Sequence, residues 1–388
     1  MNLIKRLINR VLNKYKIQKE SIYQIKNNDS NEWVYICYIA QVFYHLKDTQ
    51  YLDSHQNKRE AIIIARTFHK LGYNVYIQEG YSSRKRIPKL NFSIIFGIEP
   101  NFYTACEKFP KAQKIYYATG AYFEHQNKQI RKITDQINKA YHSNLPYKRL
   151  VKPHKSIDIA DYILQIGSNF TIKTYPEAYR SKITLIHQSQ QIRLSEFPKH
   201  YAKENEYFYL GSGGNALKGL SLLIEYFHQH TELFLNIVGP IEDEFYKIFH
   251  PQLGENIKIW GFLNINSAQF SSIIKKCNFI IYPSGSEGTP GAVINSMSQG
   301  LIPMVTPWSA FDEINDFGFL MEDWSLSSID KSIKWSLSLT DRDIEKLSEK
   351  NRIYATNYYN LNRFEDEFTQ YIKTIIKDKQ EPTCIEEK

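Results

Sequence analysis

The sequence of 388 residues lacks any long apolar run. No stretch approaches the roughly 20 apolar residues that a helix needs to span a bilayer. The N-terminus also lacks an uninterrupted apolar core followed by a small-residue cleavage site, which a secretory signal would show. We therefore expect a cytoplasmic protein that does not cross a membrane.

Cysteine is scarce. Cys37, Cys106, Cys277 and Cys384 lie far apart with no Cys-x-x-Cys spacing, so neither a zinc site nor a disulfide framework is predicted. We expect ordinary reduced thiols. No carboxylate pair with metal-ligand spacing follows a strand in the second half of the chain, so we expect no metal and no cofactor.

Acidic residues are outnumbered by basic ones, and the net charge is +8. This charge suits a phosphate-bearing ligand, an anionic membrane surface or nucleic acid. However, the sequence has no helix-turn-helix, zinc finger or aromatic RNA-binding signature, and its 28 Tyr and 22 Phe are spread along the chain. We expect no nucleic-acid partner.

Residues 1–30 form a separate basic segment at the start of the chain. Within residues 1–19, apolar side chains recur at helical spacing from Leu3 to Tyr15, with Lys5, Arg6, Arg10 and Lys14 between them. Two interpretations stay open. The helix lies in the plane of an anionic membrane surface at the cytoplasmic face, or it packs on the protein with its basic face in solvent.

From Trp33 onwards, strand-like and helical segments alternate, which predicts parallel sheets covered by helices on both faces. The alternation weakens after Ile183–Ile186, and the polar run 198–206 follows, so a domain boundary is expected near residue 190. The expected strands are Trp33–Ala40, Tyr73–Ile77, Phe92–Phe96, Lys114–Ala118 and Tyr162–Ile166, then Tyr207–Leu210, Leu233–Val238, Ile257–Trp260, Phe279–Tyr282 and Ile302–Val305.

The chain is long enough to bury two cores. We expect an α/β fold with two Rossmann-like domains, residues 31–190 and residues 191–340. Helices are expected in residues 341–388, packing back towards the N-terminal domain.

Residues 282–303 combine a buried strand, a Gly-rich turn, a helix and another turn. Ligands of open parallel sheets lie beyond the carboxyl ends of the strands, and a Gly-rich turn into a helix offers free amides to phosphate. This stretch resembles the donor-site signature of the family 4 group of retaining glycosyltransferases, in which seven residues separate two glutamates. Glu287 matches the first glutamate, whereas Asn295 stands at the second position and supplies no charge.

The resemblance implies that Glu287 contacts the donor sugar and that Asn295 holds the ribose. It also implies that the turn around them holds the sugar and the phosphates. The residues of this turn are Ser286, Gly288, Thr289, Pro290 and Gly291. Without the resemblance, Glu287 is read as a carboxylate that caps the following helix.

A second match to the family runs from Tyr207 through Gly211 to Lys218. In the family, an Arg and a Lys neutralise the diphosphate as the glycosidic bond breaks, which is electrostatic catalysis without a metal. Lys218 matches the Lys, but Ser212 stands at the Arg position, so one cation is missing. His55, Lys58 and Arg59 of the first domain are our candidates to replace it.

Two further candidates are weaker. The segment of Trp260, Gly261 and Phe262 resembles the place where the nucleotide base stacks in the family. His125 could contact the donor sugar as a catalytic residue, although a lone histidine is more often a surface or capping residue. Lys218 without the resemblance is a solvated helix residue, and Glu60 and Glu124 are read as simple first-turn carboxylates.

The resemblance covers roughly residues 205–315 and implies the GT-B architecture of two facing Rossmann-like domains. It also implies a metal-independent transferase that moves a sugar, with retention, from a nucleotide diphosphate sugar to a glycan or lipid-linked acceptor. From the class of enzyme we expect a role in the synthesis of a cell-surface polysaccharide. Two rivals stay open: another nucleotide-sugar enzyme such as an epimerase, and a degenerate, non-catalytic binding subunit. Ser212 and Asn295 favour the second rival. A dinucleotide oxidoreductase is disfavoured because no Gly-x-Gly-x-x-Gly joins a strand to a helix.

Overall fold

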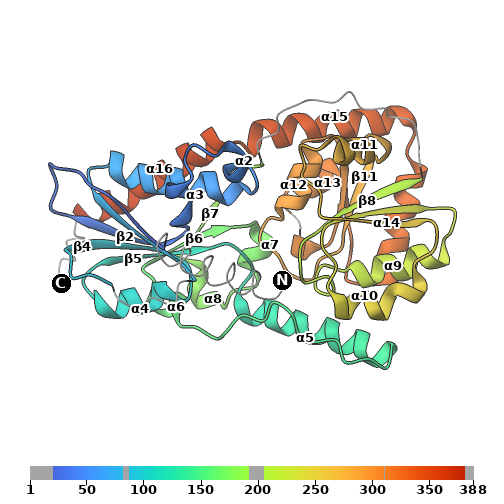
Figure 1. The fold of residues 1–388 in the computed structure, drawn as a ribbon, viewed down its shortest axis with the longest axis horizontal. Coiled ribbons are helices and arrows are strands. Elements are labelled where there is room, and N and C mark those ends of the chain that lie inside the picture. The colour runs from blue at the N-terminus through green and yellow to red at the C-terminus, as the bar shows by residue number, and fades with distance from the viewer. Residues whose placement is uncertain (1–20, 82–86, 192–204, 310, 381–388) are drawn as a thin grey trace, which may run out of the picture.

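The computed structural model describes residues 21–81, 87–191, 205–309 and 311–380, so the basic segment 1–19 and Cys384 lie outside it. Two α/β domains lie side by side, each built on its own sheet (Figure 1). This confirms the predicted fold class. Cys37, Cys106 and Cys277 are buried and free. Among the described helices, none is long and apolar enough to cross a membrane.

The first sheet has seven strands in the order β1-β3-β2-β4-β5-β6-β7. All neighbours are parallel except β1, an edge strand that pairs antiparallel with β3 and that the sequence pattern did not predict. The strands are β1 (Ile22–Ile25), β2 (Trp33–Tyr38), β3 (Asn74–Glu79), β4 (Phe92–Gly97), β5 (Gln113–Ala118), β6 (Tyr162–Ile166) and β7 (Ile183–Ile186). The helices are α2 (Thr49–Leu52), α3 (Gln56–Lys70), α4 (Asn101–Lys108), α5 (Phe123–Ala140), α6 (Ser156–Ile159), α7 (Asn169–Ile172) and α8 (Glu177–Arg180).

The second sheet has six parallel strands in the order β10-β9-β8-β11-β12-β13. The strands are β8 (Glu206–Leu210), β9 (Phe234–Val238), β10 (Ile257–Gly261), β11 (Phe279–Tyr282), β12 (Ile302–Val305) and β13 (Phe319–Leu320). The helices are α9 (Leu220–Gln229), α10 (Asp243–Phe249), α11 (Ala268–Lys276), α12 (Gly291–Met297), α13 (Ile314–Phe317), α14 (Leu326–Ser338), α15 (Asp341–Tyr358) and α16 (Leu361–Gln380).

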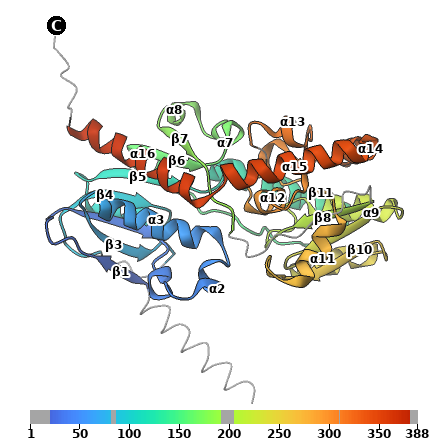
Figure 2. The same ribbon diagram turned by 90° about the horizontal axis from the view of Figure 1, so that it is seen from above.

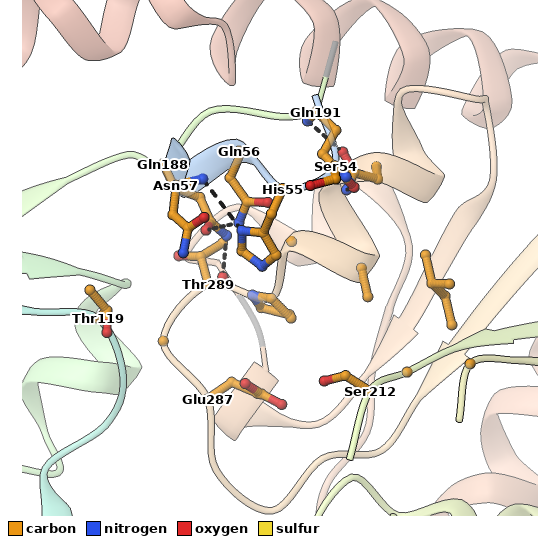
Figure 3. A pocket seen from close by; sticks show the side chains of 18 of the residues that line it. Ser54, His55, Gln56, Asn57, Thr119, Gln188, Gln191, Ser212, Glu287 and Thr289 are labelled. Carbon is orange, nitrogen blue, oxygen red and sulfur yellow. Dashed lines mark hydrogen bonds between the residues drawn. The ribbon is translucent and has the colours of Figure 1, made fainter. Parts of the chain in front are cut away.

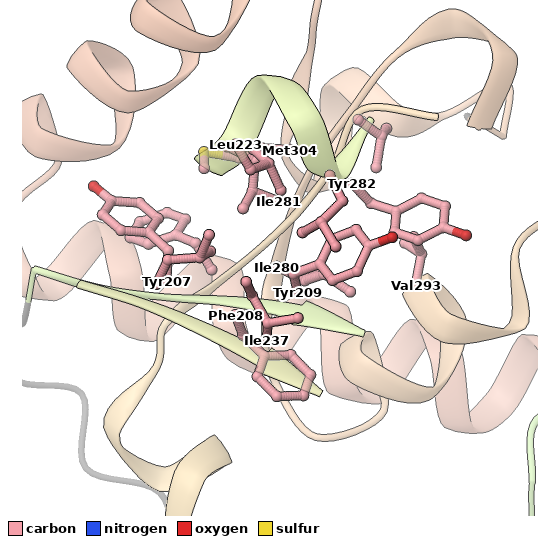
Figure 4. Packing of buried hydrophobic residues seen from close by; sticks show 14 of the residues in the cluster. Tyr207, Phe208, Tyr209, Leu223, Ile237, Ile280, Ile281, Tyr282, Val293 and Met304 are labelled. Atoms are coloured by element: carbon pink, nitrogen blue, oxygen red, sulfur yellow. The ribbon is translucent and has the colours of Figure 1, made fainter. Parts of the chain in front are cut away.

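The core of the second domain explains why its strands read as continuous apolar runs. Tyr207, Phe208 and Tyr209 follow one another along β8 and are all buried, because helices cover both faces of the sheet (Figure 4). The Tyr209 ring stacks on the Tyr282 ring of β11 at 5.7 Å. The packing therefore fixes the two strands whose ends carry the donor-site signature.

The two domains exchange helices. Helix α5 lies within the first half of the sequence, but Ile130, Ile133 and Ile137 pack into the core of the second domain. Conversely, α16 packs on α3 of the first domain through Phe364, Phe368 and neighbouring apolar side chains. Figure 1 shows α5 running beneath the second domain, and Figures 1 and 2 show α16 returning over the first. Each domain is thus held by a helix that comes from the other half of the chain.

Two crossings between the domains, one after β7 and one between α15 and α16, are bonded together. The Gln190 amide donates to the Tyr359 carbonyl at 2.7 Å. His187 lies between the Glu367 carboxylate, 3.1 Å from Nδ1, and the Tyr358 hydroxyl, 3.0 Å from Nε2. These contacts hold the two crossings together.

Candidate functional site

The carboxyl ends of the two sheets face a common cleft with a cavity of about 650 Å³. The first domain contributes Tyr38, His55 and Thr119, which follow or end β2, begin α3 and follow β5. The second domain contributes side chains from the ends of β8 and β11. Figure 3 shows His55 pointing into the space that Glu287 and Ser212 border. This is where the topology of an open parallel sheet places a ligand.

Glu287 and Lys218 form the charged centre of the cleft. The Lys218 Nζ lies 3.8 Å from the Glu287 Oε1, and both side chains are largely buried, at 8% and 16% exposed. The same carboxylate oxygen accepts from the Tyr282 hydroxyl at 2.9 Å and from the Ser284 hydroxyl at 3.3 Å. The carboxylate is therefore held in one position rather than left free to cap a helix.

Lys218 is not a solvated helix residue. Its ammonium donates to the Ser212 hydroxyl at 3.0 Å. Burial lowers the pKa of Lys218, whereas the Glu287 carboxylate opposes this shift by favouring the charged form. Ser212, at the position where the resemblance calls for an arginine, thus orients the remaining cation.

Gly219 allows Lys218 to approach Glu287. Its φ is +75°, and a Cβ at this position would lie 2.2 Å from the Pro283 carbonyl oxygen. Only glycine fits such an approach of the backbone. The turn before α9 therefore packs directly on the turn that leads to Glu287, which brings the two charged side chains together.

The Gly-rich turn also touches the first domain. A Cβ at Gly288 would lie 2.6 Å from the Ile166 carbonyl oxygen and 3.0 Å from that of Thr119, at the ends of β6 and β5. The Thr289 carbonyl accepts from the amide of Gln188 in the interdomain crossing, and Gln188 in turn accepts from Gln56 at 3.0 Å. The turn is thus part of the contact between the domains as well as a wall of the cleft.

Asn295 has a structural partner. Its side-chain oxygen accepts from the Gln191 amide N–H, and its side-chain nitrogen donates to the Gln191 side-chain oxygen, both at 2.9 Å. The residue still lines the cleft. The ribose role remains a prediction, but the structure adds a second task, which is to hold the interdomain crossing against α12.

Only one residue of the predicted base-stacking segment, Phe262, lies in the cleft. Phe262 lines the cleft and is 79% exposed, so its ring is available to a ligand. Trp260 turns away and donates from Nε1 to the Asn236 side chain at 3.0 Å. Gly261 lies between them with φ +67°, and its carbonyl accepts from the Gly239 amide. Neither Trp260 nor Gly261 borders the cavity in the described part of the chain.

The basic cluster of the first domain contributes only its histidine to the cleft. His55 caps α3 and lines the cavity, and burial lowers its pKa. The Lys58 ammonium is engaged by the Ser54 hydroxyl at 2.7 Å and lies 3.5 Å from the centre of the Tyr51 ring. Arg59 pairs with Asp53. The structure therefore does not place Lys58 or Arg59 where they could replace the arginine that is missing at Ser212.

His125 and Ser286 lie behind the wall of the cleft. The His125 ring is 4.6 Å from the Trp308 ring, and the backbone of Gly285 is its polar neighbour. The Ser286 side chain is 2% exposed. Neither residue is among those that border the cavity, so the structure does not place them with Glu287 and Lys218.

Sequence reasoning missed Arg149, which follows α5 and borders the cleft. It also treated Glu60 as a simple first-turn carboxylate. Glu60 is instead buried, and one of its oxygens accepts from the amide and the hydroxyl of Ser189 at 2.6 and 2.8 Å. The sequence could have predicted the burial of Glu60, because this residue lies on the apolar face of α3.

Burial raises the pKa of Glu60 to about 7, although the bonds from Ser189 oppose the shift. The folded state therefore disfavours the ionised carboxylate, and this group makes the protein less stable as pH rises from about 4.5 to about 7. We expect Glu60→Gln, which keeps an acceptor for Ser189, to be more stable than wild type at pH 8 by about 3 kcal/mol. Chemical denaturation at pH 5 and pH 8 checks this. An equal stability difference between variant and wild type at both pH values would contradict it.

A second cavity of about 360 Å³ adjoins the cleft on the side of the first domain. Arg149 and Glu287 border both cavities, so they form part of the wall between the two. Its other walls are largely aromatic, with two titratable side chains among them, Glu99 and His154. The aromatic residues are Tyr81, Tyr116, Tyr117, Tyr122, Phe123 and Tyr175.

Glu99 and His154 have shifted acidities. Burial raises the pKa of Glu99 to about 7 and lowers that of His154 to about 4. The Glu99 Oε1 and the His154 Nδ1 lie 3.3 Å apart without hydrogen-bond geometry, and neither atom has another hydrogen-bond partner among the described residues. Near neutral pH this pair therefore offers a neutral imidazole and a carboxyl group that is partly protonated.

Comparison with known proteins gives a family match for part of the chain and a fold. Residues 190–354 match the family described as "Glycosyl transferases group 1". Similar solved structures include a sucrose-phosphate synthase from Thermosynechococcus elongatus, at 11% identity and a TM-score of 0.59 over 90% of this chain and 100% of that one. A glycosyltransferase from Rickettsia africae has 17% identity and a TM-score of 0.58 over 91% of this chain and 100% of that one.

The Anabaena protein HepE, solved in complex with UDP and glucose, has 11% identity and a TM-score of 0.53. The alignment covers 89% of this chain and 100% of that one. At such identities the likeness concerns the fold, which is the GT-B arrangement of two facing domains. A search of curated protein sequences gives no match.

Proposed function

We propose that this chain, a glycosyltransferase whose residues 190–354 match the group 1 family, transfers a sugar from a nucleotide diphosphate sugar to a hydroxyl of a glycan or lipid-linked acceptor. The observation that carries the proposal is the Lys218–Glu287 pair, held at the carboxyl ends of β8 and β11 within a cleft of about 650 Å³. A cleft of this size accommodates a nucleotide sugar.

The pair suits the chemistry of the transfer. When the bond between the sugar and the diphosphate breaks, the electron pair stays on the phosphate oxygen, and a fixed ammonium such as Lys218 stabilises the charge that develops there. Glu287, held by Tyr282 and Ser284, is positioned to accept hydrogen bonds from the hydroxyls of the donor sugar. The oxygen of the acceptor hydroxyl forms the new bond to the anomeric carbon, and its proton passes to the phosphate oxygen that leaves. We propose retention at the anomeric carbon on the basis of the family.

The second cavity is our candidate for the acceptor. Aromatic rings such as Tyr122 and Phe123 offer flat faces to sugar rings, and the Glu99–His154 pair offers hydrogen bonds to hydroxyls. Because this cavity opens onto Glu287, an acceptor sugar bound there has its hydroxyl next to the donor site. This arrangement favours a saccharide at the accepting end.

The membrane association and the role in cell-surface polysaccharide synthesis remain proposals drawn from the basic segment 1–19 and from the enzyme class. A second candidate function is a non-catalytic binding subunit. It is favoured by Ser212 and by the engagement of Asn295 with Gln191. It is opposed by the presence of both Lys218 and Glu287, whose charged groups lie 3.8 Å apart in the cleft.

Calorimetric titration of UDP and GDP tests the donor class. UDP is the first choice because HepE was solved with it. We expect one nucleotide to bind wild type at micromolar Kd, about tenfold or more weaker binding in Lys218→Ala, and little change in Glu287→Ala. The matching nucleotide sugar should additionally lose affinity in Glu287→Ala. If neither nucleotide binds wild type, the proposal of a nucleotide-sugar donor is wrong.

A further inference from the structure

One cation of the cleft comes from an unexpected part of the chain. Where the family has an arginine after β8, this chain has Ser212, and the nearby basic residues Lys58 and Arg59 are engaged elsewhere. Arg149, by contrast, borders both the donor cleft and the second cavity. It lies on the segment that follows α5.

This segment is attached to the second domain. Helix α5 packs into the core of that domain, and Leu145, beyond the helix end, is buried in the same cluster. The Lys148 ammonium also lies 3.6 Å from the Glu244 carboxylate of α10, but this pair is exposed to solvent and adds little to the attachment. Arg149 therefore keeps its place relative to β8 and Lys218 even if the cleft opens and closes.

The backbone after β8 is shaped to receive Arg149. The Arg149 Nη1 donates to the Gly213 carbonyl at 3.0 Å. A Cβ at Gly214 would lie 2.3 Å from the Arg149 Cδ, so the aliphatic stem crosses the face of this glycine. Arg149 itself has φ +66°, a backbone conformation that a residue other than glycine rarely adopts. Three features thus hold the guanidinium beside the loop that carries Ser212.

Most N–H donors of the Arg149 guanidinium are available to a ligand. A guanidinium has five N–H donors, and one of them is used on Gly213. In the described ranges of the chain, no carboxylate lies within ion-pair distance of Arg149, which is exposed to the cleft. Burial lowers the pKa of Lys218, and the like charge of Arg149 adds to this shift, whereas the Glu287 and Glu242 carboxylates oppose it. Two cations thus border the same space together with Glu287, and the Glu242 carboxylate is already engaged by the Gly214 and Asn215 amides.

We propose that Arg149 binds the diphosphate of the donor and takes the place of the arginine that Ser212 replaces. The proposal rests on the proposed function. Arginine suits this task because its planar fork binds two phosphate oxygens at once. When the glycosidic bond breaks, the electron pair moves onto the phosphate oxygen, and Arg149 and Lys218 stabilise it while both remain protonated.

The test is calorimetric titration of the nucleoside diphosphate, UDP or GDP, that binds wild type. Arg149→Met keeps the aliphatic stem over Gly214 and removes the charge. We expect it to weaken binding roughly 10- to 100-fold. The matched control, Lys148→Met, removes the neighbouring charge, which pairs with Glu244 and does not border the cleft, and it should change Kd by less than about threefold.

A rescue variant separates binding from a purely structural role. In Arg149→Met combined with Ser212→Arg, a guanidinium reaches the same space from β8, so we expect at least part of the affinity to return. Thermal denaturation should show similar Tm values for wild type and Arg149→Met. If wild type binds the nucleotide and Arg149→Met binds it equally well, the assignment of Arg149 is overturned while the proposed function stands. If Arg149→Met loses affinity and Tm together and Ser212→Arg restores neither, Arg149 only supports the loop. If wild type binds neither UDP nor GDP, the proposed function itself fails.

Discussion

Replacing Lys218 by methionine should lower kcat for nucleotide-sugar turnover by about 10²- to 10³-fold, the usual effect of removing one fixed donor from a developing anion. The ammonium is buried, oriented by Ser212 and 3.8 Å from Glu287, so solvent cannot replace it. Methionine keeps the length of the side chain. The measurement is release of the nucleoside diphosphate, followed continuously with a coupled assay.

The control for Lys218→Met addresses the negative charge of Glu287, which loses its partner in this variant. Without Lys218, the largely buried Glu287 carboxylate loses its nearest cation, which also destabilises the fold. The double variant Lys218→Met with Glu287→Gln removes both charges and should recover Tm without recovering kcat. Recovery of kcat in the double variant, or a kcat within about threefold of wild type in the single one, would show that Lys218 serves stability and not the leaving group.

Gly288→Ala should reduce turnover by about 10²-fold while leaving the affinity for the free nucleotide nearly unchanged. The new methyl group would lie 2.6 Å from the Ile166 carbonyl oxygen, and backbone atoms cannot yield to it as a flexible side chain would. The first domain must therefore move away from the donor turn. A displacement of about 1 Å between reacting groups is enough to cause a loss of this size. The measurements are kcat with the nucleotide sugar and Kd by calorimetry.

Gly120→Ala is the matched control, because Gly120 lies on the opposite side of the same contact. A Cβ at Gly120 would meet only the Gln126 side-chain oxygen, at 3.9 Å, which is ordinary contact. We expect this variant to turn over at nearly the wild-type rate. Equal activity of Gly288→Ala and Gly120→Ala would mean that close contact between the donor turn and the first domain is not required.

The sequence predicted those features that depend on local patterns. The ten expected strands are all present, because buried parallel strands read as apolar runs. Glu287, Lys218 and the Gly-rich turn meet in the cleft because they lie in the loops that follow two strand ends, those of β8 and β11. The edge strand β1 was missed, since its half-buried pattern has no clear apolar face.

Features that depend on distant segments could not be predicted. The predicted domain 31–190 includes α5, whereas this helix packs into the core of the second domain, so the prediction gave no hint that Arg149 lies beside Gly213. Lys58 and Arg59 looked suitable by charge, but Ser54 and Asp53 engage them within their own segment. For Asn295 the sequence suggested only a contact with the ribose, because its partner in the structure, Gln191, lies 104 positions away in the sequence. A side chain's type shows what it can bind, and the fold decides which partner it meets.

The most direct test of the account is nucleotide release from UDP- and GDP-sugars in the presence of saccharide acceptors, with wild type and Lys218→Met side by side. The account predicts that wild type releases nucleoside diphosphate from one class of donor, in step with formation of a glycosylated acceptor, and that Lys218→Met does so at least about 100-fold more slowly. Tight binding of a nucleotide sugar by wild type with no release and no transfer would contradict the account and identify the protein as a binding subunit.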